Sequence, residues 1–128
     1  MEIFKIITLS LSGLLLLFVG VMRLSNPIKT YLKNSGIKLE KEVNLLNEIR
    51  GLSSVQLFGG IIILLGIFVP KLTFTSFVIA TLIFIGFAIG RIISIRVDGK
   101  PNKQLIQGLI FELIFGVVNI FCLFTILT

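Results

Sequence analysis

Long apolar runs alternate with polar connections along the whole chain. Four of the runs reach the length of about 20 residues that a helix needs to cross a bilayer. Three of them have an uncharged centre, and the fourth is interrupted only by Glu112. The pattern therefore predicts an all-α fold, an integral membrane four-helix bundle in a single domain over residues 1–128, with spans at about residues 3–24, 51–70, 72–96 and 103–127.

The first apolar run has to be distinguished from a cleaved signal peptide. The chain contains only two alanines, Ala80 and Ala88, so no Ala-x-Ala cleavage site follows this run. The run is also longer than the roughly 7–15 apolar residues of a usual signal peptide. We therefore expect a retained span.

The connections between the runs carry different turn signals. Pro70, between the second and third runs, cannot continue a helix, which predicts a tight hairpin. Asp-Gly and Pro-Asn pairs separate the third run from the fourth, where Asn102 can cap the following helix. The first connection is longer, and Asn26-Pro27 ends the run before it. In residues 37–50 apolar and charged positions interleave, which predicts an amphipathic helix at the cytoplasmic interface that leads into the second span.

Composition and charge place the chain in a membrane and orient it. Hydrophobic residues make up 55% of the chain and charged residues 14%, against about a quarter charged in soluble domains. The net charge of +6 indicates contact with anionic lipid rather than nucleic acid, because no compact basic module is present. Only Lys5 and Lys71 of the twelve basic residues fall at the side that holds the termini. The positive-inside rule then predicts that both termini lie outside and that the other two connections lie in the cytoplasm.

The inventory of reactive side chains argues against catalysis. Histidine is absent, and the single cysteine, Cys122, lies inside the last apolar run. This excludes an intramolecular disulfide, the Ser/His/Asp and Cys/His catalytic sets and the commonest metal ligand. We therefore expect no enzyme, no metal site, no cofactor and an inert thiol.

Glu112 needs a partner, because an ionised and unpaired carboxylate inside a bilayer costs at least about 2–3 kcal/mol. At about 1.5 Å per residue it lies about 13 Å beyond Lys103, and Arg91 lies about 7 Å deep in the same half of the membrane. A guanidinium can hold a carboxylate through two hydrogen bonds, so the spacing predicts an Arg91–Glu112 pair. The pair either only fixes the register of the helices or belongs to a polar pocket that binds an anion or relays a proton. Further polar residues expected near this cluster are Arg50, Glu48, Asn47, Gln56 and Asn119.

Small residues at helical spacing predict where the spans touch, because membrane helices associate through close packing. The candidates are Gly13 and Gly20 in span one, Gly59 and Gly60 in span two, the GxxxG pair Gly86 and Gly90 in span three, and Gly108 and Gly116, which share a face with Glu112 in span four. Packing within one bundle is the expected role. A homodimer contact or a ligand groove is the alternative.

Parts of the sequence resemble a known family. They are Asn47-Glu48-Ile49-Arg50-Gly51, the pattern Gly-Arg-x-x-Ser-x-x-x-Asp-Gly-x-Pro over residues 90–101, and Glu112-Leu113. Over essentially the whole chain they resemble domain-of-unknown-function family 4345, small four-span bacterial membrane proteins that are similar in architecture to the DoxX-like group. The resemblance implies a four-helix membrane bundle in a bacterial inner (plasma) membrane, without an assigned chemistry. It also selects Arg50, Arg91 and Glu112, and it adds Asn47, Glu48, Ser94 and Asp98. On an ideal helix Arg91, Ser94 and Asp98 share a face, although Asp98 also suits the turn that follows.

Three functions remain open at this point. The first is a binding or accessory protein that holds a lipid headgroup or small anion at the Arg/Glu cluster. The second is an oligomeric proton-coupled transporter or channel that uses Glu112, and the third is a purely structural subunit of a membrane complex. The expected partners are the bilayer, a lipid or small anion, and a second copy or another membrane protein, but no nucleic acid.

Overall fold

The computed structural model describes residues 1–128 as a chain of helices without strands. Its elements are α1 (Ile3–Ser25), α2 (Pro27–Ser35), α3 (Val43–Phe68), the 3-10 turn η1 (Pro70–Leu72), α4 (Thr73–Asp98) and α5 (Lys103–Leu127). All except α2 and η1 are helices long and apolar enough to cross a membrane. The predicted all-α membrane bundle is therefore confirmed, and the chain is a multi-pass membrane protein.

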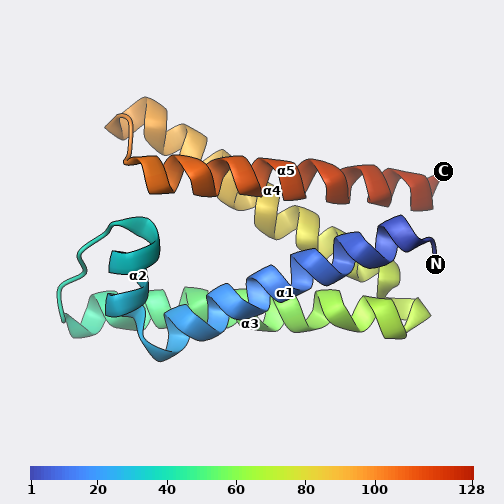
Figure 1. Cartoon of the computed structure of the whole chain (residues 1–128), viewed down its shortest axis with the longest axis horizontal. Coiled ribbons are helices and arrows are strands. Elements are labelled where there is room, and N and C mark those ends of the chain that lie inside the picture. Colours follow the sequence, from blue (N-terminus) through green and yellow to red (C-terminus); the bar gives the residue numbers. More distant parts are fainter.

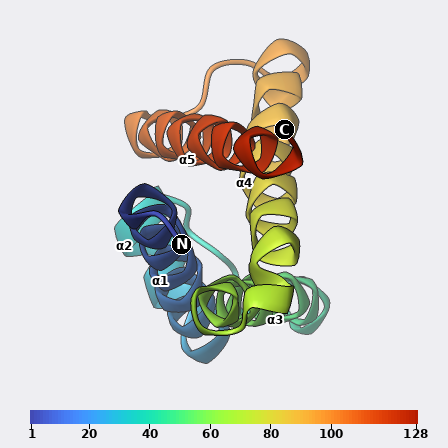
Figure 2. The same ribbon diagram turned by 90° about the vertical axis from the view of Figure 1, so that its right-hand side faces the viewer.

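The four long helices form two pairs. Helix α1 packs along α3, α4 packs along α5, and α3 connects the pairs through its contact with α4. Both termini lie at one end of the bundle with η1, whereas α2 and the α4–α5 connection lie at the other end (Figure 1). The end-on view in Figure 2 shows α1 and α5 on the left of the bundle, with α4 on the right and α3 at the bottom. Helices α1 and α5 touch over only a short stretch, and this matters for the site below.

The predicted hairpin and cap are both present. Pro70 opens η1, a single turn that reverses the chain between α3 and α4. Asn102 is the N-cap of α5, and its Oδ1 accepts a hydrogen bond of 2.9 Å from the backbone N–H of Leu105. Its Nδ2 donates to the carbonyl of Ser35 at 2.9 Å, so the same residue ties the end of α2 to the start of α5.

The predicted amphipathic helix over residues 37–50 is wrong in its bounds. Residues 37–42 are not helical, and residues 43–50 are the first two turns of α3. Glu42 sets this start, because its carboxylate accepts hydrogen bonds from the backbone N–H groups of Asn44 and Leu45. The additional helix lies earlier, as α2. Pro27 ends α1 but also suits the first turn of a new helix, where a missing N–H leaves no hydrogen bond unmade.

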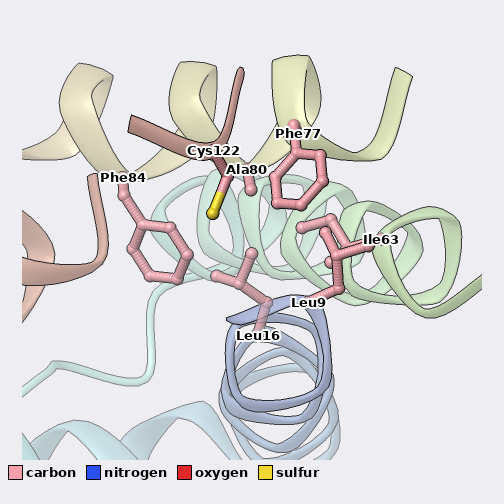
Figure 3. Close-up of a cluster of buried hydrophobic side chains, with 7 residues drawn as sticks. All are labelled: Leu9, Leu16, Ile63, Phe77, Ala80, Phe84 and Cys122. Carbon is pink, nitrogen blue, oxygen red and sulfur yellow. The ribbon is translucent and has the colours of Figure 1, made fainter. Parts of the chain in front are cut away.

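The buried apolar core lies in the half of the bundle nearer the termini. Every long helix contributes to it, and Figure 3 shows its members, Leu9, Leu16, Ile63, Phe77, Ala80, Phe84 and Cys122. Most other large apolar side chains are exposed on the outside of the bundle, as expected where lipid replaces water. The half that contains α2 has a thinner core.

Glycines explain the close approach of α1 and α3. A Cβ on Gly20 would lie 2.6 Å from the backbone nitrogen of Leu57, and one on Gly60 would lie 2.7 Å from that of Leu17. Backbone atoms cannot move aside within a helix, so only glycine permits this contact. Gly60 thus lies in a close contact between two spans, where its predicted role in packing places it. Side-chain contacts likewise fill the space around Gly59 and Gly116, against Ile83 and Ile85 respectively.

The packing predicted for the other three glycines is wrong. A Cβ added to Gly86, Gly90 or Gly108 would meet nothing within 4 Å. These residues line cavities instead of helix contacts. Spacing puts glycines on one face of a helix, but it does not determine whether a neighbouring helix or an empty space covers that face.

Candidate functional site

An ion pair joins α4 to α5 inside the membrane-spanning region. The Nε of Arg91 donates to the Oε1 of Glu112 at 2.6 Å. Arg91 lies seven residues before the end of α4, or about 10 Å along the helix, and Glu112 lies about 13 Å beyond the start of α5. Their side chains are 26% and 16% exposed, so the pair is mostly withdrawn from the surroundings but still accessible on one side.

Arg23 adds a second guanidinium to this region. It belongs to the last turn of α1, and its Cζ lies 4.6 Å from the centre of the Tyr31 ring on α2. That stacking holds the guanidinium in place without neutralising it. The structure contains one salt bridge, Arg91–Glu112, so Arg23 has no carboxylate partner. The charges of Arg23, Arg91 and Glu112 therefore sum to +1.

A cavity of about 590 Å³ lies between α1 and α5, and we call it the lateral cavity. Its polar residues are Arg23, Gln56, Arg91 and Glu112, and the remainder of its lining is apolar apart from Gly108. Leu11, Phe18 and Phe111 belong to this lining and are also 55%, 66% and 59% exposed. Because these side chains reach the outer surface of the spans, the cavity opens towards lipid.

A second cavity, of about 520 Å³, lies towards α2, and we call it the end cavity. Arg23 and Arg91 line this cavity as well as the lateral one. Tyr31, Ser35 and Ser94 give it further polar groups. The two guanidiniums therefore contribute to both cavities, each of which is otherwise lined mainly by apolar residues.

Gln56 is an unpartnered amide in the wall of the lateral cavity. Its side chain is 4% exposed, and it makes no hydrogen bond within the protein. The Oε1 atom is buried without any partner. A buried acceptor without a hydrogen bond costs about 1–3 kcal/mol.

Several residues expected in the cluster lie elsewhere. Asn47 and Glu48 are exposed on the first turns of α3 and line neither cavity. Arg50 donates from a guanidinium nitrogen to the carbonyl of Leu24, where it caps the last turn of α1. These three residues follow the family pattern at the start of α3, but α3 makes no close contact with α5, and none of the three lines a cavity with Glu112. Asp98 accepts a hydrogen bond of 2.9 Å from Ser94 and does not contact Arg91.

Asn119 belongs to a different polar group, near the termini. Its Nδ2 donates to Ser12 Oγ at 3.0 Å and to the carbonyl of Phe115 at 2.8 Å, which joins α5 to α1. One helical turn further on, the thiol of Cys122 lies 3.9 Å from Thr8 Oγ1. These buried contacts hold α1 and α5 together at one end, and beyond them the lateral cavity begins.

The sequence pattern does not identify Arg23 as a site residue, because there it is only one of the basic residues that orient the chain. One signal was available. Arg23 directly follows the uncharged centre of the first span and precedes the Asn26-Pro27 break, so it had to lie at the membrane boundary. Its proximity to Arg91 depends on how α1 crosses the bundle, which spacing along the chain does not specify.

The fold and the site together define a small four-span helical membrane protein with a net-positive cavity between its first and last spans. The chain belongs to the DUF4345 family, since the model of that family, described as a domain of unknown function, matches residues 3–123. No curated protein and no solved structure matches the chain. The family description assigns no activity, so function has to be argued from the cavity.

Proposed function

We propose that this protein is a non-catalytic binding protein that holds an oxyanion, as a lipid headgroup or a small free anion, between Arg23 and Arg91. The observation that carries the proposal is the unneutralised guanidinium of Arg23 beside a self-balanced Arg91–Glu112 pair. Arg23 is partly buried at the membrane boundary, and a charge withdrawn from water is normally paired. An anion would supply the missing charge.

The geometry of the two arginines supports an oxyanion in particular. A guanidinium presents its N–H groups in a planar fork that matches a phosphate or carboxylate. Arg91 uses Nε on Glu112, and no hydrogen bond engages its two terminal nitrogens. Tyr31 stacks on Arg23 without accepting a hydrogen bond from it. Both side chains therefore retain donors that face the cavities.

Replacement of Arg23 by glutamine is expected to weaken anion binding at least about tenfold. A hydrogen bond to a charged group contributes about 1.5–3 kcal/mol, and 1.4 kcal/mol corresponds to a factor of ten. The probes are inorganic phosphate and phosphatidylglycerol, each added to protein in a neutral detergent. Binding is measured as the rise in the midpoint of thermal unfolding, since a ligand of the folded state stabilises it.

Arg50→Gln is the matched control, because Arg50 is an arginine near the same end of the bundle that lines neither cavity. It should respond to the probes as the unchanged protein does. If neither probe stabilises the protein, or if Arg23→Gln responds like Arg50→Gln, the arginines are structural and the proposal fails.

We also propose that α2 and the α4–α5 connection face the cytoplasm of a bacterial inner membrane, with both termini outside. The support is the excess of Lys and Arg at that end. Buried Cys122 leaves the protein without an accessible thiol, so introduced cysteines can report the topology. In spheroplasts a membrane-impermeant maleimide should label Lys71→Cys directly but Lys38→Cys only after permeabilisation. The reverse pattern would invert the topology.

A further inference from the structure

We infer that the anion is the headgroup of a membrane lipid with a single negative charge, and that one acyl chain of this lipid lies in the lateral cavity. The inference rests on the proposed function and deepens it. It assigns the apolar part of the site, which a free anion would leave empty.

The shape of the lateral cavity suits an acyl chain. Its lining on α1 runs from Arg23 to Leu11, which are twelve residues or about 18 Å apart along the helix. One leaflet of a bilayer contains about 15 Å of hydrocarbon. A volume of about 590 Å³ also falls within the roughly 300–1,000 Å³ of ordinary ligand sites.

The polarity of the site changes along that length as an anionic lipid requires. Arg23, Arg91 and Glu112 lie at the end nearer α2, while Leu11, Leu14 and Phe115 lie at the other. The end cavity gives a headgroup further space beside the same two arginines. The contact between Ser12 and Asn119 closes the apolar end of the cavity. An acyl chain would therefore end inside the bundle rather than pass through it.

The opening of the cavity gives a lipid access from the bilayer. Leu11, Phe18 and Phe111 form its rim and are more than half exposed on the lipid-facing surface. The contacts between α1 and α5 include Phe4 with Phe121 and Ser12 with Asn119, on the side of the cavity that is nearer the termini. An acyl chain can therefore move sideways from the leaflet into the cavity while its headgroup stays at the level of the arginines.

The charge of the site narrows the class of lipid. The site carries a net charge of +1, which a phosphodiester with one negative charge neutralises and a zwitterionic headgroup does not. Phosphatidylglycerol carries this single negative charge and is the probe of choice, with phosphatidylcholine as the zwitterionic comparison.

Gly108→Leu tests where the acyl chain lies. Gly108 lines the lateral cavity and has open space around its Cα, so leucine there should fill the cavity without moving a helix. The affinity for phosphatidylglycerol, measured by varying the mole fraction of this lipid in neutral detergent, should fall at least about tenfold. Gly51→Leu places the same side chain on an exposed helical glycine that lines neither cavity, and it should bind as the unchanged protein does.

The outcomes separate the two proposals. If phosphatidylglycerol binding depends on Arg23 but is the same in Gly108→Leu and Gly51→Leu, the acyl chain is not in the lateral cavity and only this inference fails. It also fails if inorganic phosphate or phosphatidylcholine binds as tightly as phosphatidylglycerol. If binding does not depend on Arg23 at all, the proposed function fails as well.

A measurement on the unchanged protein guards against misfolding of the variant. Phosphatidylglycerol with a photoactivatable diazirine in its acyl chain should cross-link to the cavity lining on α1 and α5, within residues 11–19 and 108–115. A large excess of unlabelled phosphatidylglycerol should suppress these cross-links. Cross-links confined to the outward faces of α3 and α4 would overturn the inference.

Discussion

Replacement of Glu112 by glutamine is expected to destabilise the protein by about 2–3 kcal/mol, one of the two largest effects that the structure predicts. The substitution leaves Arg23 and Arg91 on the same cavity without a carboxylate. Removing one member of a buried ion pair commonly costs 3–5 kcal/mol, and about 2–3 kcal/mol is the scale for one ionised side chain within a span. The lower figure applies here because both side chains retain some exposure. The measurement is the midpoint of thermal unfolding in neutral detergent.

The double variant Arg91→Gln/Glu112→Gln distinguishes an energetic pair from two independent residues. It should be more stable than the sum of the single variants predicts, by at least about 1 kcal/mol, because it removes both charges together. Additive single effects, or single variants as stable as the unchanged protein, would show that the contact at 2.6 Å contributes nothing to stability.

The same variant should separate stability from binding. Glu112→Gln raises the net charge of the site from +1 to +2, so it should bind phosphatidylglycerol more tightly while unfolding at a lower temperature. Arg23→Gln lowers the net charge to zero and should do the opposite for binding. A structural role alone would move binding and stability in the same direction in both variants.

The second large effect is expected at the contact between α1 and α3. Gly60→Leu should destabilise the protein by about 3 kcal/mol or more, because its Cβ would lie 2.7 Å from the backbone nitrogen of Leu17 and 2.8 Å from the carbonyl oxygen of Gly13. Neither atom can move unless the helices separate. Far-ultraviolet circular dichroism during heating, together with size-exclusion chromatography, measures the loss.

Gly86→Leu is the matched control for this prediction. It makes the same change in a membrane helix, but the added Cβ meets nothing within 4 Å. Since glycine is a poor helix former, this variant should be neutral or stabilised by up to about 1 kcal/mol. If the two variants were equally unstable, helix propensity or insertion would be responsible rather than the contact between α1 and α3.

The sequence was sufficient for the architecture because lipid imposes a simple length requirement. Apolar runs of about 20 residues, Pro70 between two of them and Asn102 before the last each specify a local feature without reference to the remainder of the fold. The structure of the connection after α1 is harder to predict from the sequence. Pro27 both ends one helix and begins another, so its local preference leaves α2 ambiguous, and Glu42 rather than the apolar pattern sets the start of α3.

The site was only partly predictable from the sequence. Arg91 and Glu112 could be paired because each depth follows from the distance to its own helix end, and the energetic cost of an isolated charge required a partner. The position at the entry to the second span predicts that Asn47, Glu48 and Arg50 lie near the cluster. Position along the chain does not specify the direction in which a side chain points. Gln56, on the same helix, does reach the lateral cavity.

The sequence by itself determined that this protein is a four-span membrane bundle with an acid that must be neutralised, because hydrophobicity and the cost of buried charge act locally. Only the tertiary structure decided that Arg23 lines the same cavity as that acid, that Gly20 and Gly60 form a helix contact, and that Gly86, Gly90 and Gly108 leave space instead. These outcomes depend on how α1 crosses α3 and separates from α5. That crossing is set by the sum of contacts between helices far apart in the chain, which no local pattern contains.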